Sequence, residues 1–207
     1  MKPSTYWLLP TLFLYCTVGC EALGDEVVTG QLRNGDLIFQ TSQSSQTDLI
    51  QEVTQSNLSH VGVIYYKDNE PYVFEAIGPV VLTPLAEWIE RGKGADYIVS
   101  RLTRELTDAE QQNMYHYARK QLGKSYDIQF KWSDSKMYCS ELVWKAYEAG
   151  GIRLCEPKQF KDFDLSSDAV QQAIKQRYVS DFNDRERVVA PSDLYESDKL
   201  EVIFDTY

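Results

Sequence analysis

Residues 60–77 read HVGVIYYKDNEPYVFEAI, in which two runs of β-branched and aromatic residues flank a charged turn. Residues 61–66 and 72–77 have the composition of strands, and residues 67–71 have that of a tight turn. The stretch therefore predicts an antiparallel hairpin, and the rest of the fold can be worked out from it.

The register of this hairpin determines which side chains share a face of the sheet. With a two-residue turn at residues 68 and 69, Glu75 lies opposite Gly62. Side chains alternate between the two faces, so His60 and Glu75 become diagonal neighbours on one face, about 7–8 Å apart between backbones. Gly62 leaves the carboxylate room to lean towards the imidazole, where it would fix the tautomer and stabilise the protonated form. A register shifted by one residue would instead leave an exposed hairpin with an unrelated His and Glu.

Shorter patterns on either side predict the other elements. Apolar residues predict strands at 37–39, 80–82 and 97–102, and helical periodicity predicts helices that begin near residues 48, 84, 107 and 139. In the first helix Asp48 is the expected cap, and Leu49, Ile50 and Val53 share one side. The last third is charged and less regular. Because no linker divides the chain, we expect residues 20–207 to form a single α+β domain.

The charge balance excludes one large class of function. The chain has 31 acidic and 21 basic residues, a formal net charge of −10. A general nucleic-acid binder needs a basic surface, so no nucleic acid is expected as a partner, and attachment to anionic lipid by charge is disfavoured. The remaining choice lies between an enzyme and an acidic binding domain.

The first residues have the pattern of an export signal. Lys2 precedes an almost wholly apolar run over residues 6–18, which is too short for a membrane span of about 20 residues but fits a signal core of about 7–15. Thr17-Val18-Gly19-Cys20 resembles the lipobox of bacterial lipoproteins, whose cysteine carries the lipid. We therefore expect removal of residues 1–19, lipidation of Cys20, and a location in the cell envelope or periplasm, anchored to the membrane. Ordinary cleavage after Ala22 is the alternative.

Cys139 lies where a helix is expected to begin. The positive end of the helix dipole and the unpaired N–H groups there lower the pKa of a thiol from about 8.5, and the same N–H groups can form half of an oxyanion hole. With His60 as base and Glu75 as orienter, the sequence contains the three groups that covalent acyl transfer needs. A disulfide between Cys139 and Cys155 would remove the nucleophile, and the sequence leaves both states open.

The remaining candidates are weaker. His116, the second histidine, lies within a predicted helix and is expected to have a structural or surface role. His60, Glu75 and Cys139 would be three metal ligands, but neither a second histidine at helical spacing nor a CxxC pair supports a metal site. We therefore expect neither a metal nor a cofactor.

Together these motifs resemble the YiiX/YaeF-like proteins, circularly permuted papain-fold amidases of the NlpC superfamily. The histidine precedes the cysteine along the chain, as in the permuted members, whereas ordinary papain-like enzymes have the cysteine first. The resemblance extends from about residue 30 to residue 195. It rests on Gly35-Asp36-Leu37-Ile38-Phe39, Ser59-His60-Val61-Gly62, Val73-Phe74-Glu75-Ala76, Leu122-Gly123-Lys124-Ser125-Tyr126-Asp127, Tyr138-Cys139-Ser140-Glu141-Leu142-Val143 and Ala190-Pro191-Ser192-Asp193-Leu194.

The resemblance implies a permuted papain-like fold, with an antiparallel sheet packed against helices. It implies Cys139 as nucleophile, His60 as general base and Glu75 as the polar third residue, with Tyr126 as a weaker candidate for lining the cleft or steadying the oxyanion. The implied activity is a cysteine hydrolase of peptide or acyl-amide bonds, acting on a peptide or lipid-like substrate of the cell envelope. The alternatives are acyl transfer or lipid hydrolysis by the same residues, and a non-catalytic envelope binding module that retains the cleft.

Overall fold

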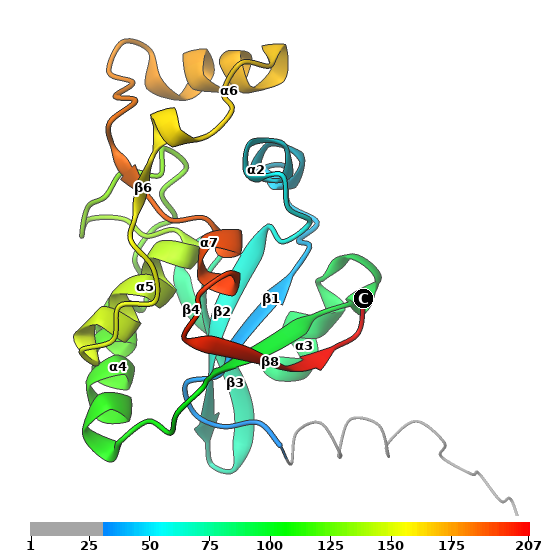
Figure 1. The fold of residues 1–207 in the computed structure, drawn as a ribbon, viewed down its shortest axis with the longest axis vertical. Helices are drawn as coiled ribbons and strands as arrows, with labels where there is room; N and C mark the ends of the chain where they lie inside the picture. The colour runs from blue at the N-terminus through cyan, green and yellow to red at the C-terminus, as the bar shows by residue number, and fades with distance from the viewer. Residues whose placement is uncertain (1–30) are drawn as a thin grey trace, which may run out of the picture. The chain divides into compact units, whose positions relative to one another are not determined.

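The main sheet contains six antiparallel strands in the spatial order β4-β3-β2-β1-β5-β8 (Figure 1). The structure, a computed structural model, describes residues 31–207, of which Leu32–Tyr207 form one compact unit. The expected export signal and Cys20 lie outside the described residues. The strands of the main sheet are β1 Leu37–Gln40, β2 His60–Lys67, β3 Glu70–Ala76, β4 Val80–Pro84, β5 Ile98–Leu102 and β8 Leu200–Asp205, and a second sheet pairs β6 Lys158–Gln159 with β7 Arg187–Val188.

The β2–β3 hairpin has the predicted register. Lys67 pairs with Glu70, and both residues of the turn between them have positive φ, 54° at Asp68 and 66° at Asn69. Two left-handed central residues define a type I′ turn, whose twist matches that of the flanking strands. β2 lies between β1 and β3 and is buried from His60 to Tyr65. The two-residue turn therefore sets the register of a buried strand.

The helices lie beside this sheet and at one end of it. α5 packs against β2 and β3, α4 packs against α5, and α2 lies close to α6 at the top of the view in Figure 1. Val143 and Tyr147 of α5 are fully buried in the core with the sheet residues Leu37, Phe39 and Val61. The helices are α2 Thr47–Thr54, α3 Leu85–Glu90, α4 Asp108–Gln121, α5 Cys139–Ala149, α6 Asp168–Tyr178 and α7 Pro191–Tyr195, with 3-10 turns at Lys93–Ala95 and Phe160–Asp162.

Two details differ from the expectations. α6 was not predicted, although Ser167 caps it by accepting a hydrogen bond from the Val170 backbone and its apolar residues bury one side. Asp48 does not cap α2, because that helix begins two residues earlier than expected, at Thr47, and its cap position falls on Gln46. The Thr47 hydroxyl instead donates to the Ser42 carbonyl at 2.8 Å, which fastens the helix start to the preceding loop.

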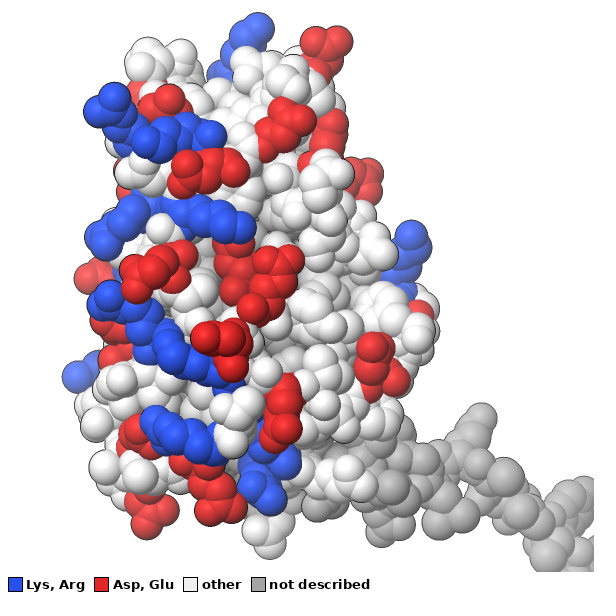
Figure 2. All heavy atoms as spheres, in the orientation of Figure 1, with Lys and Arg blue, Asp and Glu red and all other residues white. Residues whose placement is uncertain are grey.

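The surface carries charges of both signs. Figure 2 shows basic and acidic side chains interleaved on the side where α4 and α5 lie, so that neither sign dominates it. Several of these charges pair with each other, such as Arg104 with Glu110 and Arg153 with Glu148. Within residues 31–207, none of the helices has the length and apolar character needed to span a bilayer.

Candidate active site

The side chains of His60 and Glu75 contact each other between two neighbouring strands, and both are buried. His60 is the first residue of β2, and Glu75 lies near the end of the neighbouring β3. The imidazole Nε2 lies 2.7 Å from the carboxylate Oε2, and the exposed fractions of the two side chains are 7% and 0%. A Cβ added at Gly62 would stand 2.8 Å from the Phe74 carbonyl oxygen and 3.6 Å from Glu75 Cβ. The missing side chain at Gly62 therefore allows the close approach that brings the carboxylate to the imidazole.

The second oxygen of the Glu75 carboxylate is held by two further donors. Thr83 of β4 donates its hydroxyl to Oε1 at 2.5 Å, and the guanidinium of Arg91, just after α3, donates to the same oxygen. Burial raises the pKa of Glu75, but the contacts with His60, Thr83 and Arg91 outweigh it and lower the pKa below its ordinary value of 4.5. Glu75 is therefore an anion with both oxygens engaged.

Cys139 is the first residue of α5, and its side chain is buried. His60 and the backbone N–H groups of Val61 and Ser140 surround the sulfur, and each of them favours the thiolate. Burial is the largest influence and raises the pKa of the thiol, but the hydrogen bond and charge of His60 and the two N–H groups together lower it below its ordinary value. These surroundings favour the thiolate.

His60 lies between this sulfur and Glu75. Because Glu75 occupies Nε2, the nitrogen left for Cys139 is Nδ1. Burial lowers the pKa of the imidazole, but the hydrogen bonds and charges of Cys139 and Glu75 raise it to about 9. Trp88 of α3 stacks on the ring, with centroids 5.7 Å apart and planes inclined by 24°. The raised pKa of His60 and the lowered pKa of Cys139 favour an imidazolium–thiolate pair at neutral pH.

Tyr126 is a third neighbour of the sulfur. Burial, together with the charge of the neighbouring Cys139, raises the pKa of its side chain well above 10. A phenol with this pKa stays protonated, so Tyr126 can donate a hydrogen bond to the thiolate. Its backbone forms an isolated bridge with Met137, two residues before α5. The structure thus brings together all four residues that the sequence singled out: His60, Glu75, Tyr126 and Cys139.

Cys155 and His116 differ from this cluster. Cys139 and Cys155 are both free thiols, so the disulfide that the sequence left open is not formed. Burial raises the pKa of Cys155 to about 12. The chain therefore has two thiols whose pKa values are shifted in opposite directions. His116 is exposed on α4, in agreement with a surface role.

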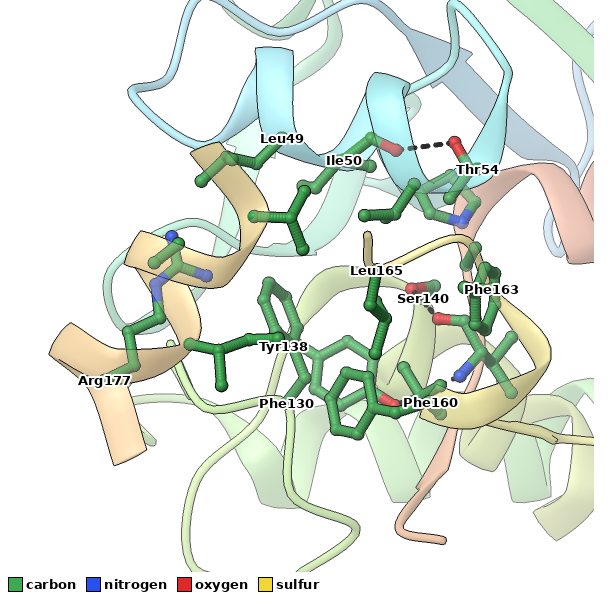
Figure 3. Close-up of a pocket in the computed structure, with 18 of the residues that line it drawn as sticks. Leu49, Ile50, Thr54, Phe130, Tyr138, Ser140, Phe160, Phe163, Leu165 and Arg177 are labelled. Carbon is green, nitrogen blue, oxygen red and sulfur yellow. Dashed lines mark hydrogen bonds between the residues drawn. The ribbon is translucent and has the colours of Figure 1, made fainter. Parts of the chain in front are cut away.

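Two hollows lie beside the site, one lined by His60 and the other by Cys139. One, which we call the His60 groove, has a mixed lining of His60, Tyr126, polar side chains of residues 40–46 and apolar side chains such as Ile77. The other, which we call the apolar pocket, has Cys139 in its lining. Figure 3 shows the side chains that α2, α6 and residues 160–165 contribute to it. Ile50 of α2 contributes to both walls, so the two hollows adjoin at this side chain.

Sequence reasoning did not find Thr83, Arg91 or Trp88 as parts of the site. Trp88 lies on the apolar side of the helix predicted after Pro84, a pattern that indicates burial without naming a neighbour. Arg91 and Thr83 reach Glu75 from segments of ordinary composition, and their role follows only from how α3 and β4 pack against β3.

Among solved structures, the chain is similar to the crystal structure of the metalloprotein YiiX from Escherichia coli O157:H7, with a TM-score of 0.81 and 42% identity, covering 86% of this chain and 99% of that one. That protein is described as a metalloprotein, so we asked whether the residues here fit a metal ion. Within residues 31–207, no three His, Cys, Asp or Glu side chains are grouped so that they could hold one. Both oxygens of Glu75 are already bound by His60, Thr83 and Arg91. The described residues therefore do not fit a metal centre.

The sequence comparisons agree with the fold. The model of the permuted papain-like amidase enzymes of the YaeF/YiiX, C92 family matches residues 31–204, a region that contains His60, Glu75, Tyr126 and Cys139. The uncharacterized protein YiiX of Escherichia coli (strain K12) is 43% identical over 174 residues, which cover 84% of this chain and 86% of that protein. The family and the fold class expected from the sequence are thus confirmed. The chain belongs to the YaeF/YiiX, C92 family of permuted papain-like amidases.

Proposed function

We propose that this protein hydrolyses amide bonds, with Cys139 as nucleophile, His60 as general base and acid, and Glu75 as the residue that orients the imidazole. The observation that carries the proposal is the position of His60. One of its nitrogens contacts a thiol of lowered pKa, and the other lies 2.7 Å from a buried carboxylate. A nucleophile, a base and an orienting group in this order are what covalent acyl transfer requires. Membership of an amidase family supports the same reaction class.

The proposed reaction has two halves. The thiolate of Cys139 adds to the amide carbonyl, the C–N bond breaks, and the His60 imidazolium gives its proton to the departing amine. Water then adds to the thioester while His60 takes one of its protons, and the C–S bond breaks. This step releases the acid and restores the thiolate and the imidazolium. Glu75 remains bound to Nε2 throughout, while the proton moves at the other nitrogen.

Negative charge develops on the carbonyl oxygen in both halves of the reaction. Cys139 is the first residue of α5, and the N–H groups of a first helical turn have no acceptor within their helix. Tyr126 adds a hydroxyl donor beside the same sulfur. We assign stabilisation of the oxyanion to these donors.

Alkylation of single cysteines, followed by mass spectrometry across a range of pH, tests this proposal. We expect Cys139 to react rapidly well below about pH 8.5, the ordinary pKa of a thiol, and to lose this advantage in His60→Ala. Cys155 is the control within the same chain and should stay slow, because its pKa is raised to about 12. If Cys139 titrates as an ordinary thiol, or reacts equally fast without His60, a binding module replaces the enzyme as the better interpretation.

We also propose that the protein acts in the cell envelope, on peptide or lipid-like amides, and is held there by a lipid on Cys20. The support is the apolar run over residues 6–18 followed by Thr17-Val18-Gly19-Cys20. The mass of the N-terminal peptide should show a lipid on Cys20, and Cys20→Ser should move the protein from the membrane to the soluble fraction. A mature chain that begins after Ala22 would contradict the anchor without affecting export.

A further inference from the structure

We propose that the His60 groove binds the amine part of the substrate, and that the amine which it selects is neutral and carries hydroxyl groups. The side-chain oxygens of Gln40 and Gln46 accept hydrogen bonds from these hydroxyls. The inference rests on the proposed function, because it describes the part of the amide that departs when the C–N bond breaks. It follows from two buried acceptor atoms in the groove that have no partner among the described residues.

Gln40 is built into the interior next to the proposed base. It is the last residue of β1 and pairs with His60 of β2. Residues paired in this way project to the same face of a sheet, and both side chains line the His60 groove. Gln40 is only 1% exposed, and its Oε1 atom is buried without a hydrogen-bond partner within residues 31–207. A buried acceptor without a partner lowers stability, so this position points to a ligand that brings a donor.

Packing alone does not account for a glutamine at this position. A Cβ at Gly92 would stand 2.3 Å from Oε1 of Gln40 and 3.2 Å from its Cδ, so the missing side chain of Gly92 makes room for the carboxamide. The backbone around it is fixed, since the N–H of Ser59 donates to the Gln40 carbonyl at 3.1 Å. A methionine would fill nearly the same volume without an unpaired polar atom. The carboxamide therefore has a role beyond filling the space.

The other polar side chains of the groove are bonded to the protein itself. The Ser59 hydroxyl donates to Ser42 Oγ at 3.2 Å, and Ser42 Oγ lies 3.1 Å from Ser44 Oγ. Nε2 of Gln43 donates to two backbone carbonyl groups just after α3. Gln46, at the cap position of α2, differs from these residues, because its Oε1 is buried and has no partner in the part of the chain that the structure describes. The groove thus offers two unpaired carboxamide oxygens to a ligand.

The charged side chains of the groove disfavour a charged amine part. Besides His60, the lining contains one acidic residue, Glu90, and one basic residue, Arg91. The guanidinium of Arg91 donates to the buried Glu75, so its charge is already paired. A carboxylate on the amine part would meet Glu90, and an ammonium group would meet the imidazolium of His60. Hydroxyl groups are uncharged donors, so they suit the two carboxamide oxygens.

The position of the groove agrees with the proposed reaction. When the C–N bond breaks, its electron pair goes to the nitrogen, which takes a proton from the His60 imidazolium, while the acyl carbon stays on the sulfur of Cys139. His60 lines this groove, whereas Cys139 lines the apolar pocket. The amine therefore belongs on the His60 side, and a hydroxylated amine held by Gln40 lies beside the group that protonates it.

Two isosteric amides test the assignment. N-hexanoylserinol carries two hydroxyl groups, and N-(pentan-3-yl)hexanamide has a methyl group in place of each, with the same acyl part. For the full-length protein, kcat/KM for the serinol amide should exceed that for the pentyl amide by about tenfold to a hundredfold. Gln40→Met and Gln46→Met should each reduce this ratio by about threefold to tenfold, and the double variant should bring it close to one. Gln112→Met, on the exposed side of α4, should leave the ratio unchanged.

The stability of Gln40→Met separates a binding role from a structural one. Because the variant removes an unpaired buried oxygen, its midpoint of urea unfolding should equal or exceed that of wild type, although the preference for the serinol amide falls. A lower midpoint together with an unchanged ratio would make Gln40 a structural residue and overturn its role in the groove.

A binding measurement separates failure of this inference from failure of the proposed function. In Cys139→Ala, calorimetric titration should show tighter binding of the serinol amide than of the pentyl amide, and added Gln40→Met should remove the difference. Equal hydrolysis of the two amides that depends on Cys139 would overturn the selection of hydroxyls and leave the amidase proposal intact. Faster hydrolysis of N-hexanoylserine, whose amine part carries a carboxylate, would also overturn the selection of a neutral amine. Selective binding of the serinol amide without any hydrolysis would support the groove and overturn the amidase, and equal binding without hydrolysis would overturn both.

Discussion

The imidazole of His60 and the carboxylate of Glu75 share a hydrogen bond of 2.7 Å between two strands joined by a two-residue turn. This bond occupies Nε2 and leaves the other ring nitrogen for Cys139. It also places a negative charge beside a ring whose pKa is raised to about 9. The orientation and the charge state of the base therefore both depend on one carboxylate.

Glu75→Gln should reduce kcat by about 10²–10⁴-fold, because a neutral amide no longer stabilises the imidazolium. The pKa of His60 should fall from about 9, so the alkaline limb of the Cys139 alkylation profile should move to lower pH. Alkylation rates across pH and kcat measure the two effects. Thr83→Val is the matched control, since it removes only a contact to the other oxygen. Equal losses in the two variants would show that Glu75 acts on stability alone.

Tyr126→Phe should raise the pKa of the Cys139 thiol, because the thiolate loses a donor while the packing of the ring is kept. The acidic limb of the alkylation profile should then move to higher pH, and kcat/KM should fall by about tenfold to a hundredfold. Tyr115→Phe, in an aromatic cluster with Tyr65 and Phe74, is the control and should change neither quantity. An unchanged acidic limb in Tyr126→Phe would leave Tyr126 as a packing residue.

Gly62→Ala should destabilise the fold by about 1–3 kcal/mol, because the added Cβ would lie 2.3 Å from Val73 Cγ1 and 2.8 Å from the Phe74 carbonyl oxygen. Urea unfolding measures the free energy of unfolding. Gly78→Ala is the matched control, since a Cβ there meets no atom within 4 Å. Its stability should stay within about 0.5 kcal/mol of wild type. Comparable losses at both positions would contradict the close approach at Gly62.

Glu141 should make the fold less stable as the pH rises. Burial raises its pKa to about 7 against partial compensation by Lys145, whereas the value of the unshifted group is 4.5. Between these values the folded state binds more protons than the unfolded state, so the free energy of unfolding falls with increasing pH. In wild type the free energy of unfolding should fall by on the order of 3 kcal/mol across this pH range, and Glu141→Gln should remove this fall.

Denaturation of Glu141→Gln at pH values on either side of the window tests that expectation. The Lys145 ammonium keeps the Ser133 carbonyl and Asp134 as partners in this variant. Glu148→Gln, which loses a surface pair with Arg153, is the control and should have a small effect, below about 1 kcal/mol. A pH dependence of Glu141→Gln identical to that of wild type would show that Glu141 ionises normally.

The part of the site that could be predicted from the sequence is the part built from neighbouring segments. His60 and Glu75 belong to one hairpin, whose short turn determines the register and hence the shared face. Cys139 could be identified because a helix start has a chemical signature of its own. Arg91 depends on how α3 packs after β4, and no local pattern encodes that.

The apolar pocket, too, could be predicted only in part from the sequence. Leu49, Ile50 and Val53 were expected on one side of a helix, but the partner of that side was not. The partner is α6, whose sequence is rich in Gln, Lys and Arg and gives a weak amphipathic pattern. Val170, Ile174 and Tyr178 recur at every fourth position behind a serine cap, which was the available signal.

The chain order of these residues has a consequence for the timing of folding. His60 and Glu75 are only 15 residues apart and meet within a hairpin, whereas Cys139 reaches them only when α5 docks from far along the chain. Contacts between distant segments close later than local ones, so we expect the base and its carboxylate to assemble first. Until α5 docks, the thiol has neither His60 nor the N–H of Val61 beside it. Pulsed alkylation during refolding should therefore show rapid labelling of Cys139 only in the last phase, and early rapid labelling would contradict this order. In a partly folded chain the Cys139 thiol therefore reacts slowly, and it becomes reactive only after α5 has docked.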